Sequence, residues 1–449
     1  MKDKNKKILL IYPSNNHVNS EKGLFLKHRK RPLIPPIELM YLASIAEHVG
    51  CNAKIKDYRF GGNFINDLLE FKPDFLVVTC STQTFKFDLE TILLAKNNLP
   101  TITTIAIGTP FWTYNKNVTY ENPYIDYVIF GEAEYALKEI LSGEENRNIL
   151  GISYSENMQT IKNDLRPHLE DLNELPFPAR HLIDNSKYKN FNNKELAVIQ
   201  ISRGCPFNRF YDLKSSITGF NIRLRSFDNI INEIQECIEK YNINNFLFQS
   251  ENFNYDKEWA MNFCKRILES KIKITWETNL FPNNIDEDLI KTMRQAGCKL
   301  INFDIESGSQ DILNNIDKNL TIDTILKVIK IIKKYRIKIF NSFLIGLPWE
   351  TEKTLKETVD FISKSKIDYF NFNLAIPYPG TRFFAYALFN KLIGPPLDYS
   401  NASEYPIMKT HELTKEQLQN CYKQLLAQNF TKKIVFANFI YKLKKLITK

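Results

Sequence analysis

One cysteine stands at a position where a metal ligand would be expected. Cys205 lies between Gly204 and Pro206, directly after a strand predicted over residues 196–202. Thiolate sulfur is the protein donor that holds iron in iron–sulfur clusters, so metal binding is the chemistry that this position could support. A single cysteine in a loop is more often structural or inert. The residue alone therefore leaves both interpretations open.

The strand before Cys205 opens a series of alternating strands and helices. Apolar periodicity predicts six strands, over residues 196–202, 245–249, 273–277, 300–305, 338–345 and 368–376. It predicts the helices that follow them over 228–241, 257–270, 286–296, 323–335, 352–365 and 383–391. Six pairs are fewer than the eight of a closed barrel. In such parallel folds the chemistry lies at the carboxyl ends of the strands.

The first part of the chain alternates in the same way. Strands are predicted over residues 7–12, 53–57, 74–80, 103–107 and 127–130. Helices are predicted over 37–48, 63–71, 87–97 and 135–141. This alternation implies a parallel sheet covered by helices on both faces. A small hairpin is predicted over 151–162, and the proline-containing stretch 166–184 is expected to cross between two domains.

Composition places the chain among ordinary intracellular proteins. Its 449 residues exceed the size at which one core usually splits, and 43% of them are apolar and 25% charged. No apolar run approaches the roughly twenty residues of a membrane-spanning helix, and the charged start shows no secretory pattern. Seven dispersed cysteines do not form a disulfide framework, which predicts a cytoplasmic location.

The charge of the chain points to no nucleic-acid partner. The net charge is +9, but the lysines are scattered over predicted helix faces rather than gathered in one basic run. Residues 431–449 alternate apolar side chains with lysines and predict a basic amphipathic helix. Such a helix could contact an anionic membrane surface, although packing of its apolar face on the protein is the favoured interpretation.

The loop over residues 201–212 resembles the cluster loop of the radical S-adenosylmethionine superfamily. In the subfamily with an N-terminal cobalamin-binding domain, this loop commonly reads S-R-G-C-P-F-N-C-x-F/Y-C. The three family cysteines hold three irons of a 4Fe-4S cluster, and the fourth iron binds S-adenosylmethionine. Its reductive cleavage yields a 5′-deoxyadenosyl radical. The corresponding residues here are Cys205, Arg209 and Asp212.

Other segments resemble the same family, in the family's order, from about residue 7 to about residue 390. They include Pro35-Pro36-Ile37, Asp57, Gly131-Glu132-Ala133-Glu134, Glu306-Ser307-Gly308-Ser309, Lys318, Gly346-Leu347-Pro348 and Pro379-Gly380-Thr381. The resemblance implies an α/β protein with a flavodoxin-like (Rossmann-like) cobalamin-type domain and a partial (β/α)6 radical-SAM barrel. We place the first domain at residues 1–150, a linker with a hairpin at 151–190, the barrel at 191–395 and a C-terminal helical segment at 396–449.

The resemblance also implies cofactor-binding residues. For cobalamin they are Thr79, Ser81, Thr84, Gly108 and Glu132. The first three lie in the loop 79–85, which is rich in the hydroxyl and amide groups that suit a polar corrin tail. An ordinary polar loop is the equally weighted alternative. For S-adenosylmethionine they are Tyr211 near the adenine, Ser250 and Glu251 near the methionine amine, and Glu306. An exposed carboxylate such as Glu306 could accept hydrogen bonds from ribose hydroxyls. The alternative is a glutamate that caps a helix.

Two of the three cluster positions lack a thiolate, and this predicts that the barrel holds no stable 4Fe-4S cluster. Arg209 stays protonated and offers no lone pair, and Asp212 is a hard oxygen donor. Cys205 would remain as a remnant ligand without iron, because one thiolate cannot hold a cuboidal cluster. Cys264 lies within a predicted helix and Cys298 starts a predicted strand, so neither replaces a missing ligand.

Three functions remain open at this point. The first is an enzyme resembling methyltransferases that uses cobalamin, with S-adenosylmethionine as an optional second cofactor, and transfers methyl groups by polar chemistry. The second is a non-catalytic protein that binds cobalamin, S-adenosylmethionine or substrate for an intact radical SAM homologue. The third is a radical enzyme with unusual cluster ligands. No residue pattern identifies the small-molecule or peptide substrate.

Overall fold

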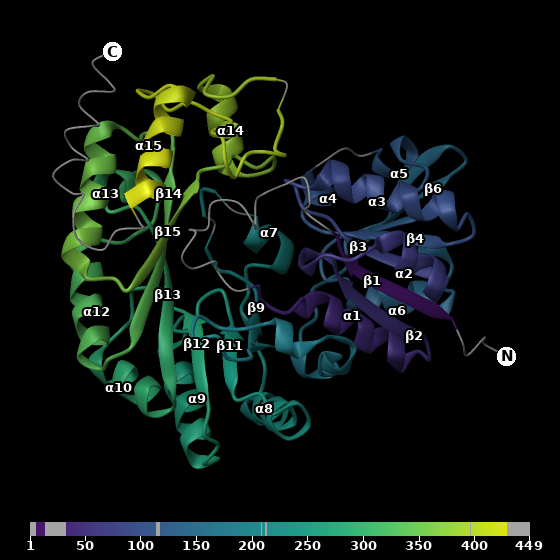
Figure 1. The fold of residues 1–449 in the computed structure, drawn as a ribbon, viewed down its shortest axis with the longest axis horizontal. Coiled ribbons are helices and arrows are strands. Elements are labelled where there is room, and N and C mark those ends of the chain that lie inside the picture. Colours follow the sequence, from purple (N-terminus) through teal and green to yellow (C-terminus); the bar gives the residue numbers. More distant parts are fainter. Residues whose placement is uncertain are drawn as a thin grey trace.

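The structure is a computed structural model that describes residues 6–13, 33–113, 117–207, 209–211, 213–395 and 397–428. Two lobes lie side by side, each built on its own sheet (Figure 1). The first sheet has seven strands in the order β2-β1-β3-β4-β5-β6-β7. Their bounds are β1 Lys7–Tyr12, β2 Asn52–Asp57, β3 Phe75–Thr79, β4 Thr103–Ile107, β5 Tyr127–Ile129, β6 Ile152–Glu156 and β7 Gln159–Lys162.

Helices cover both faces of the first sheet. Alternate residues of β1 point to opposite faces, so Ile8 and Leu10 pack against one pair of helices and Leu9 and Ile11 against the other. The first pair is α1 (Ile37–His48) and α6 (Glu134–Ser142), and the second is α2 (Phe64–Phe71) and α3 (Phe85–Asn98). Two short helices, α4 (Pro110–Thr113) and α5 (Val118–Glu121), follow β4. The parallel sheet with two covered faces is as predicted.

The hairpin predicted over residues 151–162 is part of the first sheet. Its strands β6 and β7 extend the five parallel strands in the antiparallel direction, with Tyr127 of β5 opposite Tyr154 of β6. The first sheet therefore continues beyond the last strand that the strand–helix alternation predicted.

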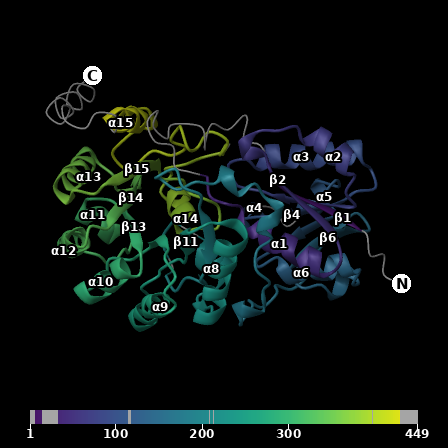
Figure 2. The ribbon, with the colours of Figure 1, turned by 60° about the horizontal axis from the view of Figure 1, so that its bottom comes forward.

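The second lobe is built on an open sheet of six parallel strands. Neighbouring strands follow one another in the chain, in the order β8-β11-β12-β13-β14-β15. They are β8 Ala197–Gln200, β11 Asn245–Gln249, β12 Thr275–Asn279, β13 Cys298–Glu306, β14 Lys338–Ile345 and β15 Tyr369–Leu374. The helices on the outside are α8 Phe227–Tyr241, α9 Lys257–Glu269, α10 Glu287–Gln295, α12 Ile322–Lys334 and α13 Glu352–Ser365 (Figure 2). This arrangement confirms the predicted partial barrel.

The barrel helices begin where side chains cap their first turns. The capping residues are Ser226, Asp256, Asp286, Thr321 and Thr351. Each accepts a hydrogen bond from a backbone N–H that has no partner within the helix. Cys264 on α9 and Cys298 at the start of β13 are buried in the barrel core, away from the carboxyl ends of the strands.

Several short elements complete the fold. A two-stranded ribbon joins β9 (Ser202–Arg203) to β10 (Arg223–Leu224), and α7 (Lys214–Thr218) lies between them in the chain. Helix α11 (Gln310–Asn315) follows β13, and α14 (Arg382–Phe389) follows β15. Short 3-10 turns lie at Tyr58–Phe60, Asn146–Asn148, Leu172–Glu174, Arg180–Leu182 and Asn185–Lys187.

The last described helix, α15 (Lys415–Gln428), packs on the barrel. Its residues Leu418, Tyr422 and Leu425 join the core of the second lobe. The amphipathic segment predicted over residues 431–449 lies outside the described residues. None of the helices in the described part of the chain is long and apolar enough to cross a membrane.

The stretch between the lobes is anchored to the barrel by a buried ion pair. Arg180, in one of the 3-10 turns, is bound by the carboxylate of Glu233 on α8 and donates to the carbonyl of Val198 on β8. Arg225 reaches the second oxygen of the same carboxylate. Removing one partner of such a buried pair would leave an uncompensated charge, so the linker is held firmly against the barrel.

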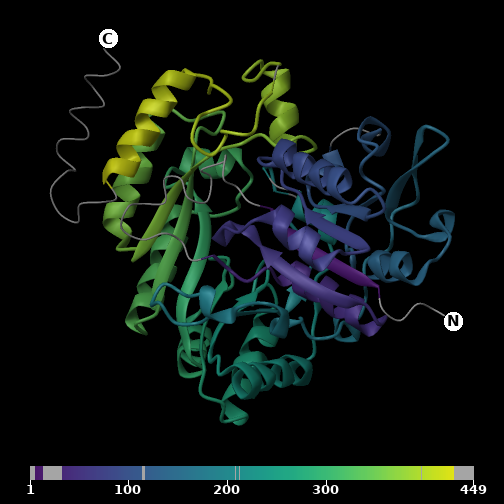
Figure 3. The ribbon, with the colours of Figure 1, turned by 45° about the vertical axis from the view of Figure 1, so that its right-hand side comes forward.

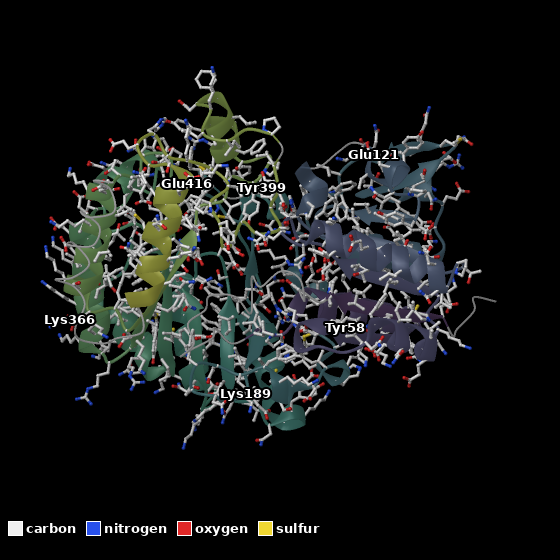
Figure 4. All side chains as sticks on the ribbon, turned by 45° about the horizontal axis from the view of Figure 1, so that its top comes forward. Tyr58, Glu121, Lys189, Lys366, Tyr399 and Glu416 are labelled. Carbon is white, nitrogen blue, oxygen red and sulfur yellow. The ribbon has the colours of Figure 1, made fainter. Side chains whose placement is uncertain are left out.

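The two lobes also contact each other near Pro377, in the segment that follows β15. Gln83, in the loop after β3, donates to the hydroxyl of Tyr378 at 3.1 Å. The Tyr378 ring stacks on the ring of Tyr399, whose hydroxyl donates to the carbonyl of Pro377 (Tyr399 is labelled in Figure 4). The segment after β15 thus contacts the loop at the carboxyl edge of the first sheet.

Candidate functional site

Figure 3 shows the two lobes side by side, and two adjoining cavities lie at their junction. The interdomain cavity has a volume of about 620 Å³ and is lined by residues of both lobes. The sheet-edge cavity has a volume of about 410 Å³ and lies at the carboxyl edge of the first sheet. The two share the residues Tyr12, Glu38, Thr79, Gly131 and Ile217. Ligands of parallel α/β sheets bind at this edge of the strands.

Four of the five residues predicted to bind cobalamin line the sheet-edge cavity. They are Thr79, Ser81, Thr84 and Gly108. Thr84 donates to the carboxylate of Asp88 and shares a 2.6 Å hydrogen bond with the hydroxyl of Ser81. Thr79 donates to the carbonyl of Ile11 at 3.0 Å. These hydroxyl groups therefore order the loop after β3, and they have lone pairs left with which to accept from a ligand.

Asp88 accepts the hydrogen bonds that order this loop, and the sequence reasoning did not single it out. It lies on α3, is 1% exposed and accepts from the backbone N–H of Ser81 at 2.9 Å. Burial raises the pKa of Asp88 to about 7, although the hydrogen bonds from Thr84 and Ser81 act in the opposite direction.

Gly108 has a structural reason to be glycine. Its φ is +132°, and a Cβ atom at this position would lie 2.0 Å from the carbonyl oxygen of Cys80. The strands β3 and β4 could not approach each other in this way with any other residue. Gly108 therefore gives the sheet-edge cavity a stretch of wall made of bare backbone.

The fifth predicted residue, Glu132, is bound by arginines of the other lobe. Its carboxylate pairs with Arg223 at 2.9 Å and with Arg203 at 3.4 Å, and it accepts from the backbone N–H of Leu169. Burial alone would raise its pKa, but the Arg223 hydrogen bond and the Arg203 charge hold the pKa of Glu132 below its usual value. Arg203 also donates to Glu134 at 2.5 Å. The segment Gly131 to Glu134 thus ties the two lobes together at the wall of the interdomain cavity.

The four residues predicted to bind S-adenosylmethionine fall into two groups. Ser250 and Glu251, at the end of β11, line the interdomain cavity, and Ser250 accepts from the hydroxyl of Ser202 at 2.7 Å. Tyr211 and Glu306 line neither of the two cavities at the lobe junction. The structure therefore does not bring all four together in one described cavity at this junction.

Glu306 is buried rather than exposed, which corrects the expectation from the sequence. It is 4% exposed, and Tyr211 donates to its carboxylate at 2.5 Å. The ammonium of Lys318 donates to the same oxygen at 3.0 Å and to the Tyr211 hydroxyl at 2.9 Å. The carboxylate could not be recognised as buried from sequence, because Lys318 is twelve positions away and its direction depends on the turn after α11.

Tyr211, Glu306 and Lys318 form a barrel-mouth cluster, and burial shifts the pKa values of Tyr211 and Lys318. Desolvation lowers the pKa of Lys318, although the Glu306 charge opposes the shift and that of Arg209 adds to it. Desolvation and the Glu306 charge raise the pKa of Tyr211 far above its usual value. The hydroxyl therefore stays protonated and acts as the donor to Glu306.

The loop of Cys205 holds a single sulfur. Cys205 is fully buried, its N–H donates to the carbonyl of Gly219, and its Sγ lies 3.8 Å from the carbonyl oxygen of Phe207. Arg209 lies 4.0 Å from Asp304, with its guanidinium over the Phe207 ring. Asp212 lies outside the described residues. Among the residues that the structure describes, no group of three His, Cys, Asp or Glu side chains could hold a metal ion.

Glu38 is a cavity residue that the sequence reasoning missed. It lies in the first turn of α1 and lines both cavities. The signal in the sequence was a single acidic residue before a mostly apolar run from Leu39 to Ala46, all of which is buried in the structure. Such a carboxylate must face either solvent or a polar space within the protein.

Comparisons with known proteins agree on both lobes. The model of the B12 binding domain matches residues 30–141, and that of the radical SAM superfamily matches residues 201–362. An uncharacterised methyltransferase of Pyrococcus horikoshii is 32% identical over 401 residues, which cover 87% of this chain and 86% of the relative. The anaerobic magnesium-protoporphyrin IX monomethyl ester cyclase of Rubrivivax gelatinosus is 24% identical and covers 86% and 71% of the two chains.

Solved structures share the fold at low identity. Apo OxsB, a cobalamin-dependent S-adenosylmethionine radical enzyme, has a TM-score of 0.72 and 15% identity, and the match covers 95% of this chain and 67% of OxsB. The methyltransferase TsrM from Kitasatospora setae, with cobalamin and a [4Fe-4S] cluster bound, has a TM-score of 0.69 and 16% identity. That match covers 94% of this chain and 85% of TsrM. At these identities the likeness concerns the fold.

Proposed function

The chain belongs to the cobalamin-dependent radical SAM methyltransferase family, and from this premise we propose that it is a methyltransferase-like, cobalamin-binding protein that works without a 4Fe-4S cluster. The observation that carries the second half is the donor set of the cluster loop. Cys205 is the one thiolate at the three family positions, and Arg209 and Asp212 take the other two. A cuboidal cluster needs three protein thiolates in this family, so the residues present do not fit it.

The surroundings of Arg209 support the absence of iron. Its guanidinium lies against Asp304 and the Phe207 ring, and its charge contributes to lowering the pKa of buried Lys318. A cluster site with one thiolate and a nearby fixed cation would have to bind iron without the anionic ligands that hold it. Radical chemistry that starts from a cluster is therefore not part of the proposed function.

Cobalamin fits the lobe junction better. The sheet-edge cavity offers the hydroxyls of Ser81 and Thr84 and the bare backbone of Gly108 at strand ends, where a polar nucleotide tail would find acceptors and space. When bound, cobalamin supplies a transferable methyl group. The protein's part would be to hold the corrinoid between the lobes and to keep water from it.

The residues of the barrel give weaker support for S-adenosylmethionine binding than the sheet-edge cavity gives for cobalamin binding. Ser250 and Glu251 face the interdomain cavity and could receive a methionine amine. Glu306 and Tyr211 are bound to Lys318, so ribose hydroxyls would have to replace those hydrogen bonds. We infer that any nucleotide binds less tightly than in a family member with iron, because the bond from methionine to iron is missing.

The barrel-mouth cluster also supports a second candidate, a non-catalytic partner of an intact radical SAM homologue. An internally satisfied Tyr211, Glu306 and Lys318 needs no nucleotide to stabilise it. In this alternative the chain would bind cobalamin or substrate and present it to the homologue.

Anaerobic purification with reconstitution tests the main proposal. We expect no stoichiometric iron and no broad cluster absorbance, together with about one cobalt per chain after incubation with hydroxocobalamin. Iron near four per chain with reductive cleavage of S-adenosylmethionine would contradict the proposed absence of a cluster. Absence of cobalt binding at high micromolar hydroxocobalamin would contradict the proposed cobalamin binding and leave the partner role.

A further inference from the structure

Glu38 differs from every other charged residue around the interdomain cavity for which contacts are described. Glu132 and Glu134 are paired with Arg203 and Arg223, and Arg59 is held by Asp57. The carboxylate of Glu38 is exposed to the cavity, and it makes no hydrogen bond or ion pair with any of the described residues. It lies at the junction of the two cavities, so a ligand that filled both would pass it.

The environment of Glu38 makes it a proton-accepting group near neutral pH. Desolvation by the surrounding protein raises the pKa of Glu38 to about 7, although the side chain remains accessible within the cavity. The Glu134 charge raises the pKa further, and Arg203 acts in the opposite direction. The other titratable or charged groups that line the two cavities are Tyr12, Tyr41, Arg59, Cys80, Asp88, Glu132 and Glu251.

A ligand that fills this cavity would remove solvent from the exposed Glu38 carboxylate, so the ligand must itself donate to that carboxylate. Leaving a buried acceptor unsatisfied carries the full penalty of its desolvation, and the penalty is larger for a charged group. The rim of a corrinoid carries primary carboxamides, whose N–H groups are donors of the required kind. Resting on the function proposed above, we propose that Glu38 accepts a hydrogen bond from a carboxamide of the bound corrinoid, and that corrinoid binding is coupled to the release of the Glu38 proton.

The coupling has a definite sign. Hydrogen bonds donated to the carboxylate favour its charged form, so the pKa of Glu38 should fall when the corrinoid binds. Binding then releases a proton below about pH 7. The affinity should rise as the pH increases toward 7 and level off above it, because the carboxylate is already formed there.

The test is a titration with methylcobalamin, whose upper ligand does not titrate in this range. For the wild-type full chain we expect about tenfold tighter binding near pH 8 than near pH 6. Glu38→Gln should bind with one affinity at both pH values, about as weakly as the wild type at the lower pH. Calorimetry in two buffers of different ionisation enthalpy should show proton release near pH 6.5 for the wild type and none for Glu38→Gln.

Matched variants separate this role from a general effect of charge or folding. Glu70→Gln, on the exposed face of α2, should keep both the affinity and the pH dependence of the wild type. Glu38→Asp retains the charge and should restore part of the pH dependence. A thermal unfolding curve for each variant confirms that the compared chains are folded.

The outcomes distinguish the inference from the function on which it rests. If the wild type fails to bind methylcobalamin at either pH, the proposed function is wrong. If the wild type binds and Glu38→Gln has the same affinity and the same pH dependence, this inference is wrong and the proposed function stands. A pH dependence that persists in Glu38→Gln and disappears in Asp88→Asn would assign the proton to Asp88 and would also overturn it.

Discussion

The lobe junction and the mouth of the barrel differ in how their polar side chains are satisfied. At the barrel mouth, Tyr211, Glu306 and Lys318 hydrogen bond with one another in a buried cluster. At the junction, Glu38 faces a cavity without a partner among the described residues. A region that satisfies its own polar groups gains little from a ligand, whereas an open carboxylate gains much. A ligand would therefore add more new hydrogen bonds at the junction of the lobes than at the barrel mouth.

The largest effect is expected from a variant that restores the missing cluster ligands of the barrel. Arg209→Cys combined with Asp212→Cys provides three thiolates with the family spacing around Cys205. We expect iron to rise from near zero to about four per chain after anaerobic reconstitution. The single variant Arg209→Cys is the matched control and should stay low in iron. If the double variant also binds no iron, the rest of the loop has lost the geometry of a cluster site.

The second expected effect concerns the stability of the barrel-mouth cluster. Glu306→Ala leaves the Lys318 ammonium buried beside Tyr211 without its counter-charge. We expect a loss of about 3–5 kcal/mol in the free energy of unfolding, measured by urea denaturation. The exposed pair of Glu236 and Lys240 is the control, and Glu236→Ala should cost less than about 1 kcal/mol. Adding Lys318→Met to Glu306→Ala should recover much of the loss, and an additive second loss would contradict the account.

The third expected effect concerns the cavities at the junction. Thr79 lines both, so Thr79→Phe would place a ring in the space assigned to the corrinoid. We expect the affinity for hydroxocobalamin to fall at least about tenfold, read from the visible spectrum. The exposed Thr101 is the control position, and Thr101→Phe should bind as the wild type does. Unchanged binding in folded Thr79→Phe would move the cobalamin site elsewhere.

The smallest expected effect compares two nucleotides at the barrel. Lys318 and Arg209 place positive charge near Tyr211 and Glu306, and S-adenosylmethionine brings a sulfonium of the same sign. We therefore expect S-adenosylhomocysteine to bind at least as tightly, by up to about tenfold.

Calorimetry with both nucleotides checks this expectation on the wild type and on Glu306→Gln, which keeps the size of the side chain. Weaker binding of both nucleotides to the variant would support a ribose contact. If neither nucleotide binds the wild type, or if the variant changes nothing, the barrel carries no nucleotide site at Glu306.

The sequence was a good guide to the frame and a poorer one to the side chains. The strands and long helices were predicted within a few residues, because apolar periodicity and caps are local signals. The parallel direction of strands β1 to β5 and of the six barrel strands followed from the alternation of strands and helices. The short ribbon of β9 and β10 was missed, since two-residue strands have no period to read.

The contacts of the site residues depend on segments far apart in the sequence. Glu132 meets Arg203 and Arg223 of the other lobe, more than seventy positions away, so its pairing could not be read from its neighbours. The burial of Glu306 likewise depends on the path of the chain to Lys318. Sequence reasoning placed these residues at strand ends, but the partners that they meet there are set by the packing of whole elements.

The burial of the cysteines gives the native protein a built-in set of chemical reporters. All seven are buried and none is in a disulfide. Desolvation raises the pKa of the Cys80 thiol, which would make it slow to react with alkylating reagents in the folded state. Cys80 also lines the sheet-edge cavity, so the rate of its alkylation would follow the opening of that cavity and its filling by a ligand. Mass spectrometry of a single thiol could therefore record the state of the lobe junction without any added label.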